Sequence, residues 1–321
     1  MRAIRFHQFG PPEVLRIDDI ADPVPGAGQV VVRVHAIGVN PVDTYIRSGN
    51  YALRPALPAV LGHDAAGVIE SVGEGVTRWK PGDRVYTSRC LTGAYAEKTL
   101  CDRQFVHELP DTVSFAQGAG INVPYGTAYR ALFHRAAVRA GEFVLVHGAS
   151  GGVGTAAVQL AAAHGCRVIG TAGTERGLQL VRDQGAQHAV NHRSPGYQDQ
   201  IIGLTGDRGG VDAIIEMLAN VNLDHDLRML ARGGRVVVVG NRGRVEIDAR
   251  QTMAKESSIL GMQLWAGGDA ALIEAHDGIV AGLRAGFLKP IVGRELPMSD
   301  AARAHRQIME EAAYGKIVLM V

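Results

Sequence analysis

The stretch HGASGGVG, residues 147–154, decides the fold of this 321-residue chain. It follows an apolar run at 142–147 that has the character of a buried strand, and it opens a helical stretch of small residues at 154–164. Its glycines have the spacing G-x-x-G-x-x-G, which allows a tight turn, close approach of a pyrophosphate to the backbone, and close packing of helix on strand. The motif therefore predicts a Rossmann-type dinucleotide site, with amides at the helix N-terminus facing the phosphates.

Beyond this loop, apolar runs alternate with stretches of helical spacing. Further strands are expected at 166–171, 189–191, 211–216, 235–240, 259–264 and 316–321, and helices at 174–184, 194–205, 223–231 and 269–285. Several strand candidates are apolar at nearly every position, as in a parallel sheet covered by helices on both faces. This part of the chain is therefore predicted to be a doubly wound α/β domain.

The chain up to residue 115 has a different character. Runs rich in β-branched residues at 29–37 and 65–72 are separated by turn residues such as KPGD at 80–83. Many short strands with such turns predict a β-rich, partly open barrel. Helical stretches follow at 115–134, with a break expected at 124–126 (PYG).

The composition excludes several classes of protein. Lys and Arg number 33 against 32 Asp and Glu, and the net charge of +1 gives no field that would attract nucleic acid or an anionic membrane. Three cysteines without CxxC spacing argue against a disulfide framework and a zinc cluster. The N-terminus lacks the apolar segment of a signal peptide, and no apolar run approaches the ~18 residues of a membrane span. We expect a cytoplasmic protein.

The end of the second strand of the α/β domain bears on the choice of nicotinamide cofactor. An NAD site places an acidic residue there, which accepts hydrogen bonds from the ribose 2′-hydroxyl. Here Gly173 stands in that position. Cationic and hydrogen-bonding side chains stand nearby at Arg176, His192, Arg193 and Arg242. Because a phosphate group prefers such donors, we predict NADPH; the alternative, in which Glu175 binds the ribose of NADH, stays open.

Two N-terminal stretches, NPVDTYIRSG at 40–49 and LGHDAAGVI at 61–69, resemble the medium-chain dehydrogenase/reductase superfamily when taken together with the glycine loop. Within that superfamily, the chain is similar to the zeta-crystallin-like NADPH-dependent quinone oxidoreductases. The stretches that carry this similarity are 123–130, 146–154, 215–223 and 253–258. The resemblance runs nearly from end to end of the chain.

This resemblance implies a GroES-like catalytic domain at 1–118 and 265–321 and a Rossmann domain at 119–264, and so an α/β fold class. It also implies reduction of ortho- and para-quinones with NADPH by one-electron transfer, without a metal. With Arg176 added from the argument above, the cofactor-binding residues are Tyr45, Ser150, Gly151, Gly152, Val153, Gly173, Arg176, His192, Asn222, Val239, Gly240, Asn241, Arg242, Met262, Gln263 and Leu264.

The residues at the possible ligand positions also favour a site without a metal, independently of the overall resemblance. Asn40 stands where zinc-dependent relatives have a catalytic cysteine, and no second soft ligand occurs near Tyr125. Cys90 has no neighbouring cysteines that could complete a structural zinc lobe. His63 occupies the position of a zinc-binding histidine, but one histidine cannot make a tetrahedral site. We therefore expect His63 to pack or to hydrogen-bond.

Quinone reduction demands little acid–base chemistry, because the acceptor is strongly oxidising and the cofactor supplies the electrons. We therefore expect no nucleophile. Asn40 and Tyr45 are predicted to hold the nicotinamide and to donate to a developing oxyanion, and Tyr51 or Tyr129 to wall the pocket. Packing in the core is the alternative for each of these aromatic residues. His305, in polar helical surroundings, is expected to be solvated.

Two other functions stay open. An NADPH-dependent reductase of enones or alkenals would also need a donor that protonates the α-carbon. A non-catalytic NADPH- and RNA-binding protein of the crystallin type is disfavoured by the near-neutral charge and the lack of a basic run. We expect a homodimer or homotetramer, paired through a sheet edge formed by 244–247 and 259–262.

Overall fold

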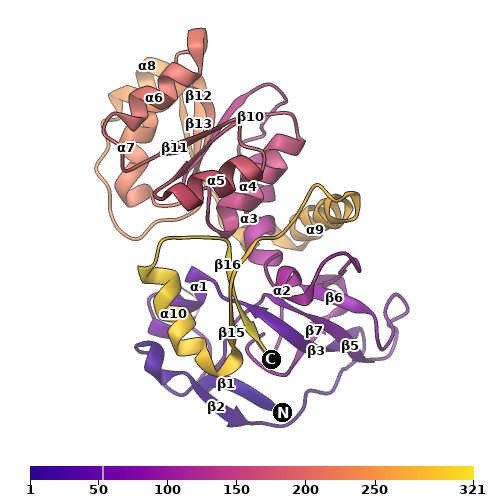
Figure 1. Cartoon of the computed structure of the whole chain (residues 1–321). Coiled ribbons are helices and arrows are strands. Elements are labelled where there is room, and N and C mark those ends of the chain that lie inside the picture. The colour runs from indigo at the N-terminus through magenta and orange to yellow at the C-terminus, as the bar shows by residue number, and fades with distance from the viewer. Residues whose placement is uncertain (53) are drawn as a thin grey trace. The chain divides into compact units, whose positions relative to one another are not determined.

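The computed structural model describes residues 1–52 and 54–321, which form two compact units (Figure 1). The N-terminal unit comprises Met1–Val123, His276–Glu311 and Gly315–Val321, and the second unit comprises Pro124–Ala275 and Ala312–Tyr314. The predicted domain boundaries, after residues 118 and 264, lie before those of the two units, which follow Val123 and Ala275.

The second unit is built on a six-stranded parallel sheet with the order β11-β10-β9-β12-β13-β14. Its strands are β9 (Phe143–Val146), β10 (Arg167–Ala172), β11 (His188–Asn191), β12 (Val211–Glu216), β13 (Leu230–Val238) and β14 (Ser258–Gly261). All residues of β9 and β12 are buried, which explains their apolar sequences. The strand order reverses between β9 and β12, and ligands of doubly wound sheets bind at such a point. The predicted α/β sheet is confirmed.

Helices cover both faces of this sheet, with α3, α4 and α5 together on one face and α6 and α7 on the other (Figure 1). The helices of this unit are α3 (Thr127–Tyr129), α4 (Gly152–Ala163), α5 (Glu175–Asp183), α6 (Tyr197–Leu204), α7 (Ala219–Met229) and α8 (Arg250–Lys255), with short turns η5 (Gly206–Arg208) and η6 (Leu264–Gly267). Helix α9 (Gly268–Ala285) begins in this unit, and its residues from His276 on belong to the N-terminal unit. The small residues of α4 are buried almost throughout, so this helix packs closely on the strands.

The predicted helix break at 124–126 is wrong. Helical turns run through it as η3 (Asn122–Gly126), α3 and η4 (Arg130–Arg135), and both η segments are wide π-type turns. Pro124 falls in the first turn of this segment, where a backbone amide has no helical acceptor, so its missing N–H costs nothing there.

The N-terminal unit is β-rich, as predicted, and holds two sheets. A seven-stranded sheet has the order β15-β16-β3-β5-β6-β8, with β7 paired to β3, and a three-stranded sheet has the order β2-β1-β4. The strands are β1 (Arg2–Phe6), β2 (Arg16–Asp19), β3 (Gln29–Gly38), β4 (Ala59–Val60), β5 (Ala65–Val72), β6 (Arg84–Thr87), β7 (Lys98–Asp102), β8 (Val106–Glu108), β15 (Val292–Pro297) and β16 (Lys316–Met320). Among the described strands of this unit, only β15 and β16 pair in parallel.

The helices of this unit are α1 (Pro41–Ser48), α2 (Phe115–Gly118) and α10 (Ala301–Glu310), with short turns η1 (Pro12–Val14), η2 (Arg103–Phe105) and η7 (Met298–Asp300). Proline occupies the first position of α1, and the amide of Asn40 donates to the Asp43 side chain at 2.9 Å, so the helix begins here. It ends at Gly49, whose φ of +77° favours glycine. Helix α1 carries Tyr45, and α10 packs against α1.

Candidate functional site

The predicted cofactor residues of the second unit gather at one edge of its sheet. Each follows the carboxyl end of a parallel strand, and these ends meet at the same edge. The glycine loop follows β9, Gly173 and Arg176 follow β10, His192 follows β11, Asn222 follows β12, 239–242 follow β13, and Met262, Gln263 and Leu264 follow β14. The sequence thus placed the whole set at the position where doubly wound sheets bind their ligands.

The glycine loop has the geometry of a phosphate site. Gly148 turns the chain with a φ of +56°, and the amide of Gly151 donates to the Gly148 carbonyl at 3.0 Å. A Cβ on Gly154 would lie 2.3 Å from the Gly148 carbonyl oxygen, so this position excludes any side chain. Helix α4 then begins at Gly152, and its first amides have no partner within the helix. The loop therefore fits a pyrophosphate, which would accept from these amides.

Residues Ala312–Tyr314, which the sequence did not indicate as part of the site, lie against this loop. The Ser150 hydroxyl donates to the carbonyl of Ala313 at 2.8 Å, and a Cβ on Gly151 would lie 3.2 Å from the Ala313 methyl group. The Arg176 guanidinium lies over the ring of Tyr314, 3.7 Å from its centroid. Residues Ala312–Tyr314 therefore pack against the side of the site that holds Ser150 and Arg176.

The end of β10 brings basic side chains together. A Cβ on Gly173 would lie 2.8 Å from both Nε2 of His192 and Nε of Arg193, so only glycine leaves room for the two side chains. His192, Arg193 and Arg176 are exposed at this edge. Partial desolvation of the ring, together with the nearby His147 and Arg193, lowers the pKa of His192, so its imidazole is neutral near pH 7 and able both to donate and to accept. The arrangement suits a phosphate group next to a ribose.

The residues after β12 and β13 are held by one buried residue, Glu216, the former through its carboxyl group and the latter through its backbone carbonyl. The Asn222 amide donates to the oxygens of Glu216 at 3.2 and 3.3 Å. The backbone amides of Val239 and Gly240 donate to the Glu216 carbonyl at 2.9 and 3.1 Å. The side chains of Asn241 and Arg242 are exposed, and the Asn241 amide donates to the Gly243 carbonyl at 2.8 Å.

The segment after β14 is held by a buried arginine. The Arg130 guanidinium donates to the carbonyl of Gln263 at 2.6 Å and also to that of Leu264. Leu264 is buried, Met262 is half-buried and the Gln263 side chain is exposed. Arg130 thereby holds the backbone of a segment that the resemblance places along the cofactor.

Asn40 of the N-terminal unit is 2% exposed, and its polar atoms are engaged within the fold. Its side-chain amide donates to Asp64 Oδ2 at 3.0 Å, and its side-chain oxygen accepts from the Lys316 ammonium group. These contacts give Asn40 a role in holding α1. Its donation to an oxyanion stays a prediction and would require the bond to Asp64 to break.

The three tyrosines predicted at the site have different surroundings. Tyr45 is half-buried on α1, and Tyr51 packs on the hydrophobic core of the N-terminal unit. Tyr129, in the second unit, packs edge-on against Phe133, with 4.8 Å between ring centroids, and against His134 at 5.6 Å. Packing therefore accounts for the Tyr51 and Tyr129 rings, and their place in a substrate pocket stays a prediction.

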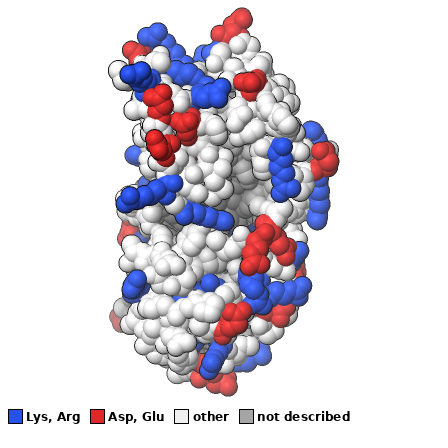
Figure 2. Space-filling model, turned by 90° about the vertical axis from the view of Figure 1, so that its left-hand side faces the viewer, with Lys and Arg blue, Asp and Glu red and all other residues white. Residues whose placement is uncertain are grey.

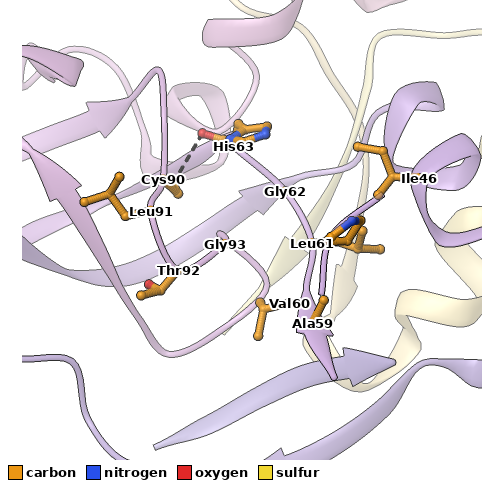
Figure 3. A pocket seen from close by; sticks show the side chains of 11 residues that line it. Ile46, Ala59, Val60, Leu61, Gly62, His63, Cys90, Leu91, Thr92 and Gly93 are labelled. Carbon is orange, nitrogen blue, oxygen red and sulfur yellow. Dashed lines mark hydrogen bonds between the residues drawn. The ribbon is translucent and has the colours of Figure 1, made fainter. Parts of the chain in front are cut away.

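A cavity of about 330 Å³ lies in the N-terminal unit (Figure 3). Its lining residues are Ile46, Pro55, Ala59, Val60, Leu61, Gly62, His63, Cys90, Leu91, Thr92 and Gly93. The Cys90 thiol donates to the His63 carbonyl at 3.5 Å. Burial lowers the pKa of His63, so its imidazole is neutral near pH 7. The lining residues are mostly aliphatic or small and carry no charge, which suits a small uncharged molecule.

The prediction that His305 is solvated is wrong, because its side chain is 1% exposed. Helix α10 packs against α1 and places the imidazole between two partners. Arg47 donates to its Nδ1 at 3.2 Å, and its Nε2 lies 3.1 Å from the Tyr95 hydroxyl. His276 is buried in the same unit, where Tyr86 and Asn122 contact its two ring nitrogens at 3.0 and 3.1 Å.

Both imidazoles have to stay neutral in the folded protein, since burial lowers the pKa of each to about 3. In the unfolded chain they take up protons as the pH falls below 6.5, so each reduces the free energy of unfolding by about 1.4 kcal/mol per pH unit. We expect His276→Gln to remove one such contribution. Urea unfolding measures the free energy of unfolding. As the pH falls from 6 to 4, that of the variant should rise relative to that of wild type by about 1.4 kcal/mol per pH unit. A difference independent of pH would contradict a neutral His276.

On the face seen in Figure 2, basic and acidic side chains are interspersed among uncharged residues, and neither sign dominates. Among the described residues, no helix combines the length and the apolar character that crossing a membrane requires. The mixed surface charges agree with the near-neutral composition.

Comparisons with known proteins match this architecture. Residues 152–276 match a family model described as zinc-binding dehydrogenase, and residues 26–111 match the alcohol dehydrogenase GroES-like domain. A quinone oxidoreductase of Homo sapiens is 51% identical, over 100% of this chain and 98% of the human protein. Two solved structures are 31% identical over 100% of both chains: an NAD-dependent alcohol dehydrogenase with a TM-score of 0.93, and a mycobacterial protein complexed with NADPH with a TM-score of 0.90.

The fold, the strand order and the glycine loop agree with these matches along the whole chain. They define an oxidoreductase with a GroES-like domain and a Rossmann domain that binds a nicotinamide cofactor. The chain belongs to the zeta-crystallin-like quinone oxidoreductases of the medium-chain dehydrogenase/reductase superfamily.

Proposed function

We propose that this protein transfers electrons from NADPH to quinones. The observation that carries the proposal is the carboxyl edge of the parallel sheet, where a loop that excludes side chains at Gly154 stands beside the basic group of Arg176, His192 and Arg193. The identity of 51% with a human quinone oxidoreductase supports a quinone as the acceptor.

The residues present fit this cofactor. Amides at the start of α4 would bind its pyrophosphate, and the basic group at the end of β10 would bind its 2′-phosphate. When bound, NADPH supplies the reducing electrons. The cavity that contains His63 would hold the uncharged acceptor, since none of its lining residues carries a charge.

Steady-state oxidation of NADPH with two kinds of acceptor tests the proposal. We expect kcat/KM for 9,10-phenanthrenequinone to exceed that for a 2-alkenal by at least about tenfold, because quinone reduction needs no positioned proton donor for a carbon atom. Preference for the alkenal would favour the double-bond reductase. Salt-dependent retention of RNA without turnover of either acceptor would favour the RNA-binding alternative.

Arg193→Ala is expected to raise KM for NADPH by at least about tenfold and to leave KM for NADH unchanged. A hydrogen bond between charged groups contributes about 1.5–3 kcal/mol, and about 1.4 kcal/mol corresponds to a factor of ten. Arg182→Ala changes an exposed arginine in the last turn of α5 and is the matched control. An equal change in KM for both cofactors would show that Arg193 does not bind the 2′-phosphate.

A further inference from the structure

Three ionisable side chains are buried together beneath the glycine loop. His147 follows β9, Glu216 ends β12 and Asp226 lies on α7, with exposed fractions of 3%, 0% and 0%. Nε2 of His147 lies 2.9 Å from Asp226 Oδ1 and 3.6 Å from Glu216 Oε2. One nitrogen or oxygen atom of each residue lies within 4.8 Å of the other two. None of the three is among the assigned cofactor residues.

Hydrogen bonds connect this cluster to the glycine loop. Nδ1 of His147 lies 3.3 Å from the Thr171 hydroxyl oxygen, and the backbone amide of Gly148 donates to the same oxygen at 3.3 Å. Gly148 makes the first turn of the loop. A displacement of the His147 imidazole would therefore disturb the loop through one shared oxygen atom.

The cluster also holds the segment that follows β12, across from β9 at the point where the strand order reverses. Glu216 accepts hydrogen bonds from the Asn222 side chain at 3.2 and 3.3 Å and from the backbone amide of Leu218. Asn222 is one of the predicted cofactor residues. The same three side chains thus support parts of the site that follow β9 and β12.

The charges of the cluster do not balance when both carboxyl groups are ionised. One imidazolium would then face two carboxylates out of contact with water, which leaves a buried net charge of −1. Asp226 Oδ2 is buried and accepts no hydrogen bond from any described residue. A proton on Glu216 would remove the excess charge and supply a donor. Burial indeed raises the pKa of Glu216 to about 7. Burial lowers the pKa of His147, but the carboxyl groups of Asp226 and Glu216 together outweigh it and raise that pKa above its ordinary value.

Other titratable groups also face the cluster. His192, with Arg193 beside it, approaches His147 from the end of β11, and Tyr197 approaches the carboxyl groups from α6. Burial lowers the pKa of His192 and raises that of Tyr197, so both are uncharged above pH 7. Neither changes the charge of the cluster in that range.

We propose that His147, Glu216 and Asp226 form a positioning cluster for the dinucleotide loop, and that the dinucleotide binds the form in which Glu216 carries a proton. The proposal rests on the dinucleotide binding of the proposed function and is independent of the acceptor. Loss of the Glu216 proton leaves a buried negative charge beneath the amides that face the phosphates, which weakens binding.

Titration with NADH tests this coupling, because NADH lacks the 2′-phosphate, which itself titrates near pH 6. We expect the Kd of wild type, followed by fluorescence, to rise about tenfold per pH unit above pH 7, as for one linked proton. Glu216→Gln keeps the shape of the side chain and cannot lose a proton, so this tenfold rise in Kd per pH unit above pH 7 should be absent from the variant. Asp183→Asn changes an exposed carboxylate at the end of α5 and should follow wild type.

Calorimetry on wild type gives a measurement that does not depend on the folding of a variant. At pH 8, binding of NADH should take up close to one proton, measured as the difference in binding enthalpy between two buffers of different ionisation enthalpy. No uptake, or a Glu216→Gln variant with the pH dependence of wild type, would overturn the proposal and leave dinucleotide binding intact. Failure of both NADH and NADPH to bind at any pH would overturn the proposed function as well.

Discussion

Gly154→Ala is expected to raise the Kd for NADPH more than about 100-fold. The added Cβ would lie 2.3 Å from the Gly148 carbonyl oxygen and 2.6 Å from Cα of Ala149, and both atoms belong to the backbone of the turn. The turn has to move, and the amides that face the phosphates move with it. Loss of two hydrogen bonds to charged oxygens, at about 1.5–3 kcal/mol each, accounts for this factor. Fluorescence titration measures the change.

Gly203→Ala provides the matched control for this substitution. Gly203 lies inside α6, and no atom lies within 4 Å of the position of its Cβ. Alanine should therefore leave the Kd unchanged and raise the free energy of unfolding by about 0.5–1 kcal/mol, because glycine disfavours a helix. A Gly154→Ala variant that bound NADPH within about threefold of wild type would contradict the loop geometry described here.

Asp64→Ala is expected to lower the free energy of unfolding by about 3–5 kcal/mol, because it leaves a buried ammonium group unpaired. Asp64 is 1% exposed, and its side chain accepts at 2.8–3.0 Å from Asn40, Asn122, the backbone amide of Val123 and Lys316. Lys316 is itself 4% exposed. Urea unfolding of the variant and wild type measures the loss.

The double variant Asp64→Ala/Lys316→Met tests the cause of this loss. With the ammonium group removed as well, the double variant should be more stable than Asp64→Ala alone by at least about 2 kcal/mol. Arg232→Ala breaks an ion pair with Glu256 whose side chains are 78% and 69% exposed, and it should cost less than about 1 kcal/mol. Additive losses from Asp64→Ala and Lys316→Met would show that the ion pair does not stabilise the N-terminal unit.

The parallel sheet was predictable because local sequence carries its pattern. Strands β9 and β12 are buried on both faces, so every position favours an apolar residue, and the runs at 142–147 and 211–216 show it. The glycine loop was predictable for a related reason, because Gly154 excludes every side chain at a close approach of the backbone. The parallel arrangement then brought His192 and Gly173 to the same edge, as the sequence indicated.

Other elements were not predictable from local sequence. Helix α10 packs Ala301, Ala304 and Ile308 on the core from one face, but that face is short, consists mainly of alanine and includes the buried His305, so it is a weak signal in the sequence. The pairing of Asp64 with Lys316 joins residues 252 positions apart, and no local pattern indicates it. Burial of a polar side chain depends on hydrogen-bond partners that the fold supplies, which explains why His305 was expected in solvent.

The sequence contains only a weak indication of the buried cluster of His147, Glu216 and Asp226. Glu216 ends a strand in which every residue is buried, and an acidic residue at such a position needs a partner. Asp226 follows His147 by 79 positions, so their hydrogen bond became evident only in the structure.

Titration of the wild-type protein with NADPH and with NADH tests the central claim most directly. The basic group at the end of β10, formed by Arg176, His192 and Arg193, should make NADPH bind at least about tenfold more tightly than NADH at pH 7. Equal affinities, or tighter binding of NADH, would contradict the assignment of this group to a 2′-phosphate.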